Sequence, residues 1–266
     1  MKQTSNKTVN KTKRTIAAFL AAVTVLTAFA GCSGKDEESS SSSQNSTVSS
    51  DSNSSSSSSS SQTENLSTTN DDEFYYTLTD DEKSYIISSY NGEDAAVYNI
   101  PSEHDGLKVT EISMRAYDTR EDIVEVNISD TVTKIGFSAF MFCPNLERVN
   151  MGNGVEIIED SAFIGCEKLS ELTLSENLTE IQASGFQRCT SLKKVTIPDG
   201  VTTIGEVAFG GCTSLEEIHI PASVIEMLGS NQSGVFANSD KVTIYAPAGS
   251  YAEQYAKDND IPFVAE

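Results

Sequence analysis

Four cysteines stand at one repeated spacing and are the first candidates for chemistry. Cys143, Cys166, Cys189 and Cys212 follow one another at identical intervals, and each comes directly after the same short pattern of an aromatic residue and two others. Thiols at regular intervals could hold zinc, form disulfides or act as redox groups. Zinc requires four ligands that converge tetrahedrally at about 2.3 Å. The choice therefore depends on the elements that position the cysteines.

The cysteines belong to a repeat of about 23 residues, which lies in the range of solenoid periods. Its units begin at Val109, Val132, Val155, Leu178 and Val201, with a degenerate sixth unit at Val224. Apolar columns run through the units: Ile112, Ile135, Ile158, Ile181 and Ile204; Tyr117, Phe140, Phe163, Phe186 and Phe209; Ile123, Leu146, Leu169, Leu192 and Leu215. The end of each unit alternates between apolar and polar residues, which predicts a short half-buried strand. One coil cannot bury its own apolar face, so the coils must stack and align these strands in a parallel sheet.

Stacking decides between the possible roles of the cysteines. Equivalent positions of successive coils form a row with steps of about 4.8 Å, and a row cannot converge on one zinc ion. Neighbouring coils do allow the Cα separation of a disulfide, but the side chains should point inward in parallel. We therefore predict a structural ladder of buried, reduced cysteines at Cys143, Cys166, Cys189 and Cys212, and no metal site.

The segment 1–31 resembles an export signal. Five cations, the last of them Arg14, precede an apolar run from Thr15 to Gly31, which is shorter than the roughly 20 residues of a membrane span. The ending "FAGC" resembles a bacterial lipobox and predicts Cys32 as the lipidated first residue of the mature protein, although Phe29 stands where Leu, Val or Ile is commoner. The alternative is an ordinary secretory signal followed by an incidental cysteine.

The predicted mature protein is strongly acidic. Removal of the signal takes the formal charge from -21 to -26, which excludes a nucleic-acid binder because phosphate contacts need cations. The stretch 32–70 is rich in serine and almost without apolar residues, so it cannot offset the entropy of ordering. We expect a flexible tether with a reach of roughly 35 Å.

The repeat "VTTIGEVAFGGCTSLEEIHIP" resembles the BspA-like leucine-rich repeat of bacterial and protist surface proteins. The first unit departs from it, with Tyr117 for Phe and Arg120 for Cys. The resemblance implies a leucine-rich repeat solenoid that is mainly β, an α/β-type curved stack of coils with a parallel sheet on its concave face. It also implies surface display, no catalysis and no cofactor. The predicted segments are the signal peptide 1–31, tether 32–70, β-rich N-terminal cap 71–108, repeats 109–246 and helix–strand C-terminal cap 247–266. Asn91-Gly92 is the expected hairpin turn of the N-terminal cap.

Two polar columns should line the concave face and are the candidate binding site. The charged column is Glu125, Arg148, Glu171, Lys194 and Glu217, and the polar column is Asn127, Asn150, Thr173, Thr196 and His219. Lys241 and Thr243 are the expected next steps of the two columns. Alternating charges could contact a partner, or they could pair with each other and stabilise the parallel register. The polar column could bind a sugar chain or peptide, or consist of ordinary exposed strand residues.

The sequence favours binding over catalysis. It contains no "GxSxG", "HExxH" or phosphate-binding glycine loop, and no "DxDxDG" run for calcium. We predict a lipoprotein held by Cys32 on the extracellular face of the plasma membrane, in a Gram-positive type of envelope, with a Gram-negative outer membrane as the alternative location. It should bind extracellular protein or polysaccharide without enzymatic activity. The alternative is a structural or accessory subunit of an envelope complex in the same cell.

Overall fold

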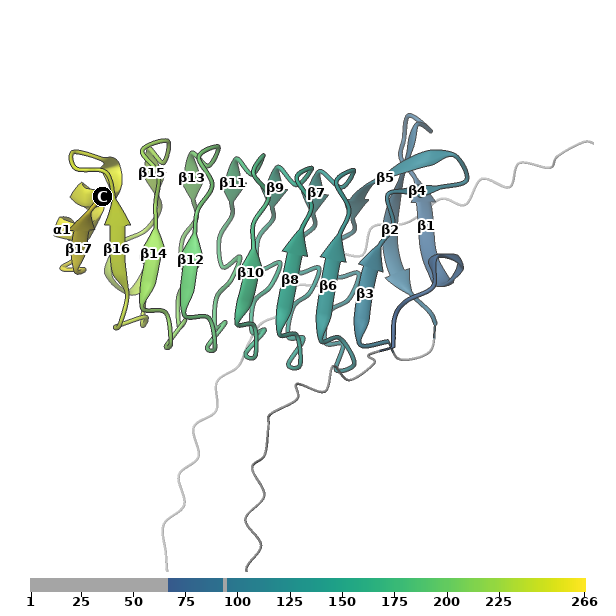
Figure 1. Cartoon of the computed structure of the whole chain (residues 1–266), viewed down its shortest axis with the longest axis horizontal. Coiled ribbons are helices and arrows are strands. Elements are labelled where there is room, and N and C mark those ends of the chain that lie inside the picture. The colour runs from purple at the N-terminus through teal and green to yellow at the C-terminus, as the bar shows by residue number, and fades with distance from the viewer. Residues whose placement is uncertain (1–66, 93–94) are drawn as a thin grey trace, which may run out of the picture. The chain divides into compact units, whose positions relative to one another are not determined.

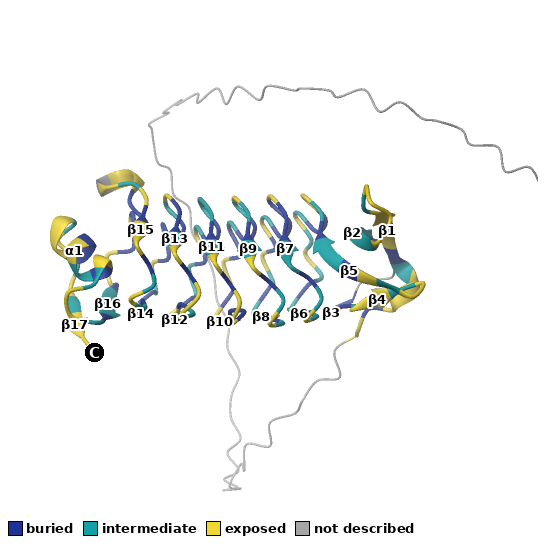
Figure 2. Ribbon diagram, turned by 90° about the horizontal axis from the view of Figure 1, so that it is seen from above, coloured by how far each residue is buried: buried dark blue, intermediate teal, exposed yellow. Residues whose placement is uncertain are grey.

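The computed structural model describes residues 67–92 and 95–266, all within one compact unit, Ser61–Glu266. The predicted signal peptide, Cys32 and most of the tether lie outside the described residues. The described chain winds into stacked coils with strands on two opposite sides (Figures 1 and 2).

The longer strands of the coils run parallel along one side of the stack (Figure 1). They are β3 (Val97–Ile100), β6 (Glu125–Ile128), β8 (Arg148–Met151), β10 (Glu171–Thr173), β12 (Lys194–Thr196), β14 (Glu217–His219), β16 (Thr243–Ala246) and β17 (Phe263–Ala265). They form two four-stranded sheets, in the orders β10-β8-β6-β3 and β12-β14-β16-β17. The parallel sheet predicted from the alternating residues is therefore present, but it is divided between β10 and β12.

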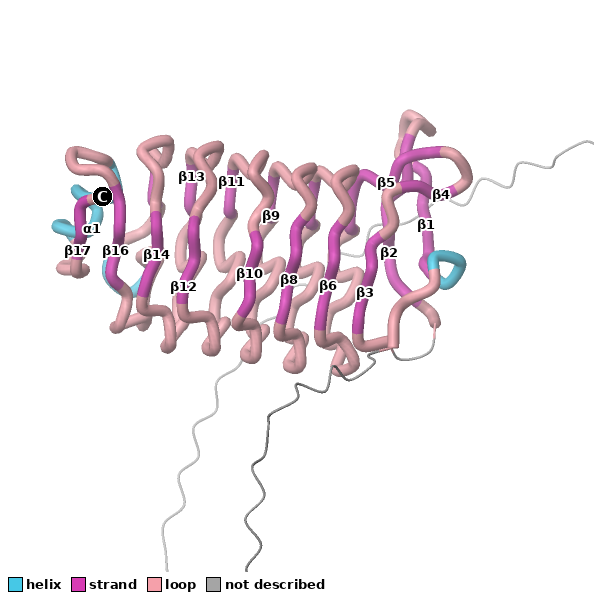
Figure 3. The backbone as a smooth tube through the Cα atoms, in the orientation of Figure 1, coloured by secondary structure: helices cyan, strands magenta, loops and turns pink. Residues whose placement is uncertain are grey.

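A second parallel ladder covers the opposite side, which the sequence analysis does not predict (Figures 2 and 3). The two-residue strands that successive coils contribute to it are β7 (Lys134–Ile135), β9 (Ile157–Ile158), β11 (Glu180–Ile181), β13 (Thr203–Ile204) and β15 (Glu226–Met227). The column of isoleucines supplies the buried residue of β7, β9, β11 and β13, and Met227 takes its place in β15. Such short strands carry too little alternation to be recognised from the sequence.

An aromatic stack fills the space between the two ladders. Phe140, Phe163, Phe186 and Phe209 are fully buried, and neighbouring ring centroids lie 5.1, 5.3 and 5.4 Å apart with planes within 10° of parallel. Each coil places its ring on the ring of the coil before, because the repeat length is constant. The stack thus ties every coil to both of its neighbours.

Each coil bends at two residues with left-handed backbone. The first bend is at Ser138, Ser161 and Ser184, with φ of 53°, 60° and 58°, and the second includes Phe142 at 53° and Gly165 at 73°. Left-handed φ is strained for most residues and free for glycine. At Gly165 a Cβ would also collide with the ring of Phe142 in the preceding coil. Glycine at 165 therefore fits both the left-handed bend and the large Phe142 ring beside it.

The N-terminal end is closed by a hairpin that the sequence analysis places wrongly. After a short 3-10 helix (Asp71–Glu73), β1 (Phe74–Leu78) pairs antiparallel with β2 (Ser84–Tyr90), and β4 (Glu103–His104) pairs antiparallel with β5 (Leu107–Ile112). The β1–β2 turn is stabilised by Asp81, whose carboxylate accepts from the Thr79 hydroxyl at 2.8 Å. Asn91-Gly92 is no hairpin turn, because β2 and β3 belong to different sheets. Both strands already run parallel to the next coil, so the coil stack begins before Val109.

The C-terminal end is covered by helix α1 (Tyr251–Asp258) and by β17, which pairs parallel with β16. A second short 3-10 helix occupies Asn231–Ser233. Ser250 caps α1 by accepting from the Glu253 N–H at 3.3 Å, as expected for a serine at a helix N-cap. Tyr255 of α1 packs edge-on against Phe236, the last ring of the stack. The helix therefore ends the aromatic column.

Candidate functional site

The long-strand face, formed by the outward-pointing residues of the longer strands, carries both predicted polar columns. Glu125, Arg148 and Glu171 lie in register on one sheet, and Lys194 and Glu217 on the other. Asn127, Asn150 and Thr173 share the next register position, as do Thr196 and His219. The residues between the columns, such as Val149 and Ile218, are fully buried. The face is therefore held rigidly by the core, but each column is interrupted between β10 and β12.

The charged column pairs within each sheet. Arg148 Nε donates to Glu125 Oε2 at 2.9 Å, and Lys194 Nζ lies 2.9 Å from Glu217 Oε2. Burial raises the pKa of Glu125, but hydrogen bonds from Arg148 and Asn127 outweigh it and leave that pKa below its usual value. Among the described residues Glu171 has no cation within 4.0 Å. Among the described residues the column thus forms one ion pair on each sheet, and Glu171 lies outside both pairs.

The polar column contains a ladder of asparagines that begins one coil earlier than predicted. Asn127 Nδ2 donates to Asn99 Oδ1 at 3.0 Å, and Asn150 Nδ2 donates to Asn127 Oδ1 at 2.8 Å. Asn99 is separated from Asn127 by 28 residues, so the period of the repeat does not reveal it. The ladder fixes three amides in one orientation along the face.

The expected continuation at the C-terminal end is wrong by two residues. Glu217 pairs with Thr243 and His219 with Tyr245, so Lys241 precedes the strand and Thr243 belongs to the charged column. The sixth repeat carries extra residues before β16, which shifts the register. The His219 ring lies on the Tyr245 ring with centroids 4.8 Å apart, and its Nδ1 lies 3.0 Å from a Glu266 carboxylate oxygen. His219 is therefore packed at the end of the face.

The four cysteines of the repeat lie in a buried row and form no disulfide. Each thiol donates to the carbonyl oxygen of the aromatic residue in the preceding coil, at 3.1 to 3.4 Å. In the next coil Ser239 takes this role, with its hydroxyl 2.7 Å from Phe209 O. Burial raises the pKa of Cys166 and Cys189, and that of Cys212 to about 12. Such thiols are protonated and poorly nucleophilic.

Of the cysteine-to-alanine changes, the one at Cys166 should lower the free energy of unfolding most. Its Sγ is the sole donor to Phe140 O among the described residues, whereas Phe163 O accepts from Cys189 Sγ and also from Cys166 N–H at 3.3 Å. Cys166→Ala therefore leaves a buried carbonyl unsatisfied, and Cys189→Ala does not. We expect urea unfolding to show Cys166→Ala destabilised by about 1 kcal/mol more than Cys189→Ala. Equal losses would contradict a hydrogen-bonding role for the thiol.

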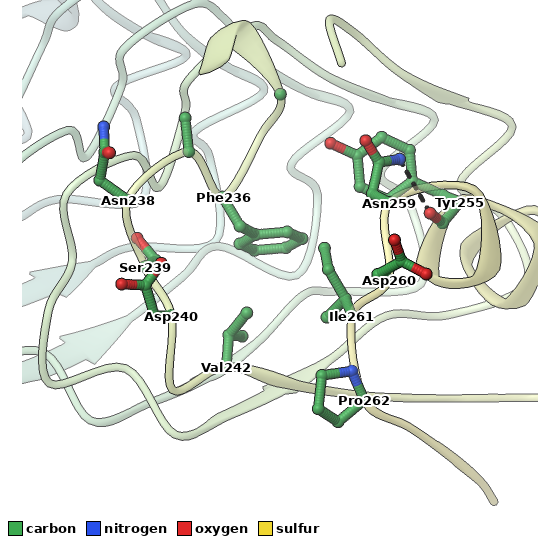
Figure 4. A pocket seen from close by; sticks show the side chains of 12 residues that line it. Phe236, Asn238, Ser239, Asp240, Val242, Tyr255, Asn259, Asp260, Ile261 and Pro262 are labelled. Atoms are coloured by element: carbon green, nitrogen blue, oxygen red, sulfur yellow. Dashed lines mark hydrogen bonds between the residues drawn. The ribbon is translucent and has the colours of Figure 1, made fainter. Parts of the chain in front are cut away.

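A pocket of about 280 Å³ lies beside α1 at the C-terminal end. In Figure 4 Phe236, Val242 and Ile261 surround its centre, with Asp240 and Asp260 on either side. Neither carboxylate has a cation within 4.0 Å among the described residues. The sequence analysis misses this pocket because its residues lie outside the regular columns. An apolar centre with two carboxylates suits a small cationic group and disfavours an anion.

The described part of the chain offers no cluster for metal chemistry. No three His, Cys, Asp or Glu side chains of residues 67–92 and 95–266 gather where they could hold an ion. No helix in the same residues is long and apolar enough to cross a membrane.

Stacked coils of near-equal length, with parallel ladders and a continuous apolar core, define a leucine-rich repeat solenoid. The profile of the BspA type leucine rich repeat region matches residues 110–243 in six copies. The chain belongs to this family of bacterial surface-type repeat proteins, whose solenoids are generally non-catalytic.

Solved bacterial structures show the same fold. A leucine rich repeat protein of T. pallidum is 30% identical, with a TM-score of 0.61, over 66% of this chain and 80% of that one. One from Bacteroides ovatus is 30% identical (TM-score 0.57; 65% of this chain, 45% of that one). A leucine rich cell surface protein of Faecalibacterium prausnitzii is 28% identical, with a TM-score of 0.53, over 67% of this chain and 54% of that one. The chain thus spans about half the length of the latter two. No curated protein matches it.

Proposed function

We propose that the protein binds an extracellular protein or polysaccharide through the long-strand face, without catalysing a reaction. The observation that carries this proposal is the rigid row of polar side chains on that face. Every second strand residue is held in the core, so the outward groups lose little freedom when a partner docks. Hydrogen-bonded amides and ion pairs of both signs provide directional contacts for a polar partner.

We also place the protein on the extracellular face of the plasma membrane, anchored by lipid at Cys32 in a Gram-positive type of envelope. The basic start, the apolar run and the "FAGC" ending support this location. The F. prausnitzii relative is itself a leucine rich cell surface protein. Fractionation of cells should find the protein with membranes, released by detergent and not by salt, whereas a Cys32→Ala variant should lose this retention.

Changing three side chains of the long-strand face should weaken partner binding. The purified protein and the variant Arg148→Ala/Lys194→Ala/His219→Ala are compared for binding to extracellular-matrix proteins, mucins and cell-wall glycans. We expect the variant to bind its partner at least ten-fold more weakly, because it loses two ion-paired cations and the packed histidine of this face.

A matched control removes the same residue types elsewhere. Arg115 and Lys257 are also ion-paired, and His104 also lies on a tyrosine, Tyr76. The variant Arg115→Ala/Lys257→Ala/His104→Ala should bind as the unchanged protein does. Equal losses in both variants would contradict the assignment to the long-strand face. If the unchanged protein binds no foreign surface, the adhesion proposal fails, and cross-linking in its own envelope tests the accessory role.

A further inference from the structure

One hollow of the described surface lies where the long-strand ladder is broken. This serine hollow has a volume of about 400 Å³ and is lined by Glu147, Lys168, Ser170, Ser191, Lys193 and Ser214. These residues precede strands β8, β10, β12 and β14, and β10 and β12 do not pair. The hollow therefore spans the break between the two sheets.

The hollow carries an excess of positive charge in an acidic chain. Lys168 Nζ donates to the neutral Asn145 Oδ1 at 2.8 Å, and neither lysine of the hollow has a carboxylate within 4.0 Å among the described residues. The Glu147 carboxylate lies 3.4 Å from Arg148, which also pairs with Glu125, so the lining carries two ammonium groups against one carboxylate. Glu216 follows Lys193 in the next coil, but the two form no ion pair. Two ammonium groups thus remain free to attract an anion.

The break also frees backbone groups beside these lysines. In the coil before, Glu147 O accepts from the N–H groups of Ser170 and Glu171 at 3.0 and 3.1 Å. In the coil after, Lys193 O accepts the equivalent hydrogen bonds from the N–H groups of Glu216 and Glu217 at 2.9 and 3.2 Å. At the step between these two coils, the Ser170 carbonyl oxygen accepts no hydrogen bond from the N–H of Lys193 or of Lys194. The hollow therefore combines uncompensated ammonium groups with serine hydroxyls and backbone donors released from the ladder.

We propose that the serine hollow binds the carboxylate or sulfate groups of an acidic polysaccharide, which rests on the proposed binding function and specifies its ligand class. Ammonium and N–H donors suit the anionic groups, and the three hydroxyls suit the neighbouring sugar hydroxyls. The lining contains no aromatic or aliphatic residue, so it lacks the apolar anchor of a protein hot spot. The C-terminal pocket, with Asp240 and Asp260, repels the same ligand.

Calorimetric titration of the purified protein tests this assignment. The probes are a glucuronate oligomer, a sulfated oligosaccharide without carboxylates, a neutral oligosaccharide of equal length and a poly-glutamate peptide. We expect binding of an acidic saccharide that weakens with salt, and none of the neutral one. The glucuronate and sulfate arms distinguish the two anionic groups. Absence of binding in both arms overturns the proposal, as does equal binding of poly-glutamate or of the neutral oligosaccharide.

Two variants that each remove two positive charges test whether the saccharide binds at the serine hollow. Lys168→Gln/Lys193→Gln should weaken saccharide binding roughly ten-fold. Lys108→Gln/Lys241→Gln removes two lysines that likewise have no carboxylate within 4.0 Å in the described chain, and it should change binding less than two-fold. Equal losses would mean that net charge alone attracts the ligand and would overturn the assignment.

The same titrations separate this proposal from the proposed function. If protein partners depend on the long-strand face but no acidic saccharide binds, only the serine hollow is overturned. The converse result is saccharide binding that depends on Lys168 and Lys193 while the long-strand-face variant binds every partner as the unchanged protein does. That result supports the serine hollow and overturns the proposed role of the long-strand face.

Discussion

Replacing Phe163 with alanine should lower the free energy of unfolding by about 3–5 kcal/mol. The ring is fully buried and stacks on Phe140 at 5.1 Å and on Phe186 at 5.3 Å. Truncation removes its burial, opens a cavity and deletes both ring contacts at once. Because each coil contacts only its neighbours, the loss falls on the coupling between the two halves of the solenoid.

Urea unfolding followed by circular dichroism measures this effect. We expect a lower midpoint, and a broader transition if the two halves begin to unfold separately. Phe137→Ala is the matched control, because that ring is 42% exposed and its removal should change stability by about 0.5 kcal/mol or less. A loss at Phe163 no greater than at Phe137 would contradict the role of the stack.

The repeat itself could be predicted because stacking imposes the same requirement on every coil. Residues of the same type as Phe163 and Ile158 recur in the neighbouring units at the period of the repeat. The core columns and the longer strands can therefore be predicted by aligning the units. The family assignment and the solenoid fold are confirmed by the match over residues 110–243 and by the T. pallidum structure.

What escaped prediction lies where the period fails. Asn99 and Ser239 continue the amide and thiol ladders, but they stand 28 and 27 residues from their neighbours Asn127 and Cys212. Tyr245 replaced the expected partner of His219 for the same reason. The break between β10 and β12 depends on backbone hydrogen bonds, which residue types do not reveal. The surface features that distinguish this chain from a regular repeat are therefore the ones that required the structure.

Asp122→Ala should destabilise the N-terminal coil by about 3 kcal/mol. Its carboxylate accepts from Arg120 at 2.8 and 2.7 Å and from the hydroxyl of buried Tyr98 at 2.9 Å. Alanine removes this acceptor from a half-buried guanidinium and from a tyrosine hydroxyl. Asp118→Ala breaks a comparable Arg–Asp pair whose arginine, Arg115, is 55% exposed, so it should cost about 1 kcal/mol or less.

The stabilisation by the ionised Asp122 carboxylate should weaken in acid. Burial raises the pKa of Asp122, but the hydrogen bonds from Arg120 and Tyr98 outweigh it and hold that pKa below the ordinary 3.8. A carboxyl group with a lowered pKa in the folded state stabilises the protein above its unfolded pKa, and this stabilisation is lost as pH falls through the folded value. The difference in unfolding free energy between the unchanged protein and Asp122→Ala should therefore be constant between pH 7 and 5 and shrink below pH 3.8. Urea unfolding at pH 7, 5 and 3 measures it, and a difference that persists undiminished at pH 3 would show that the ionised carboxylate is not what stabilises this coil.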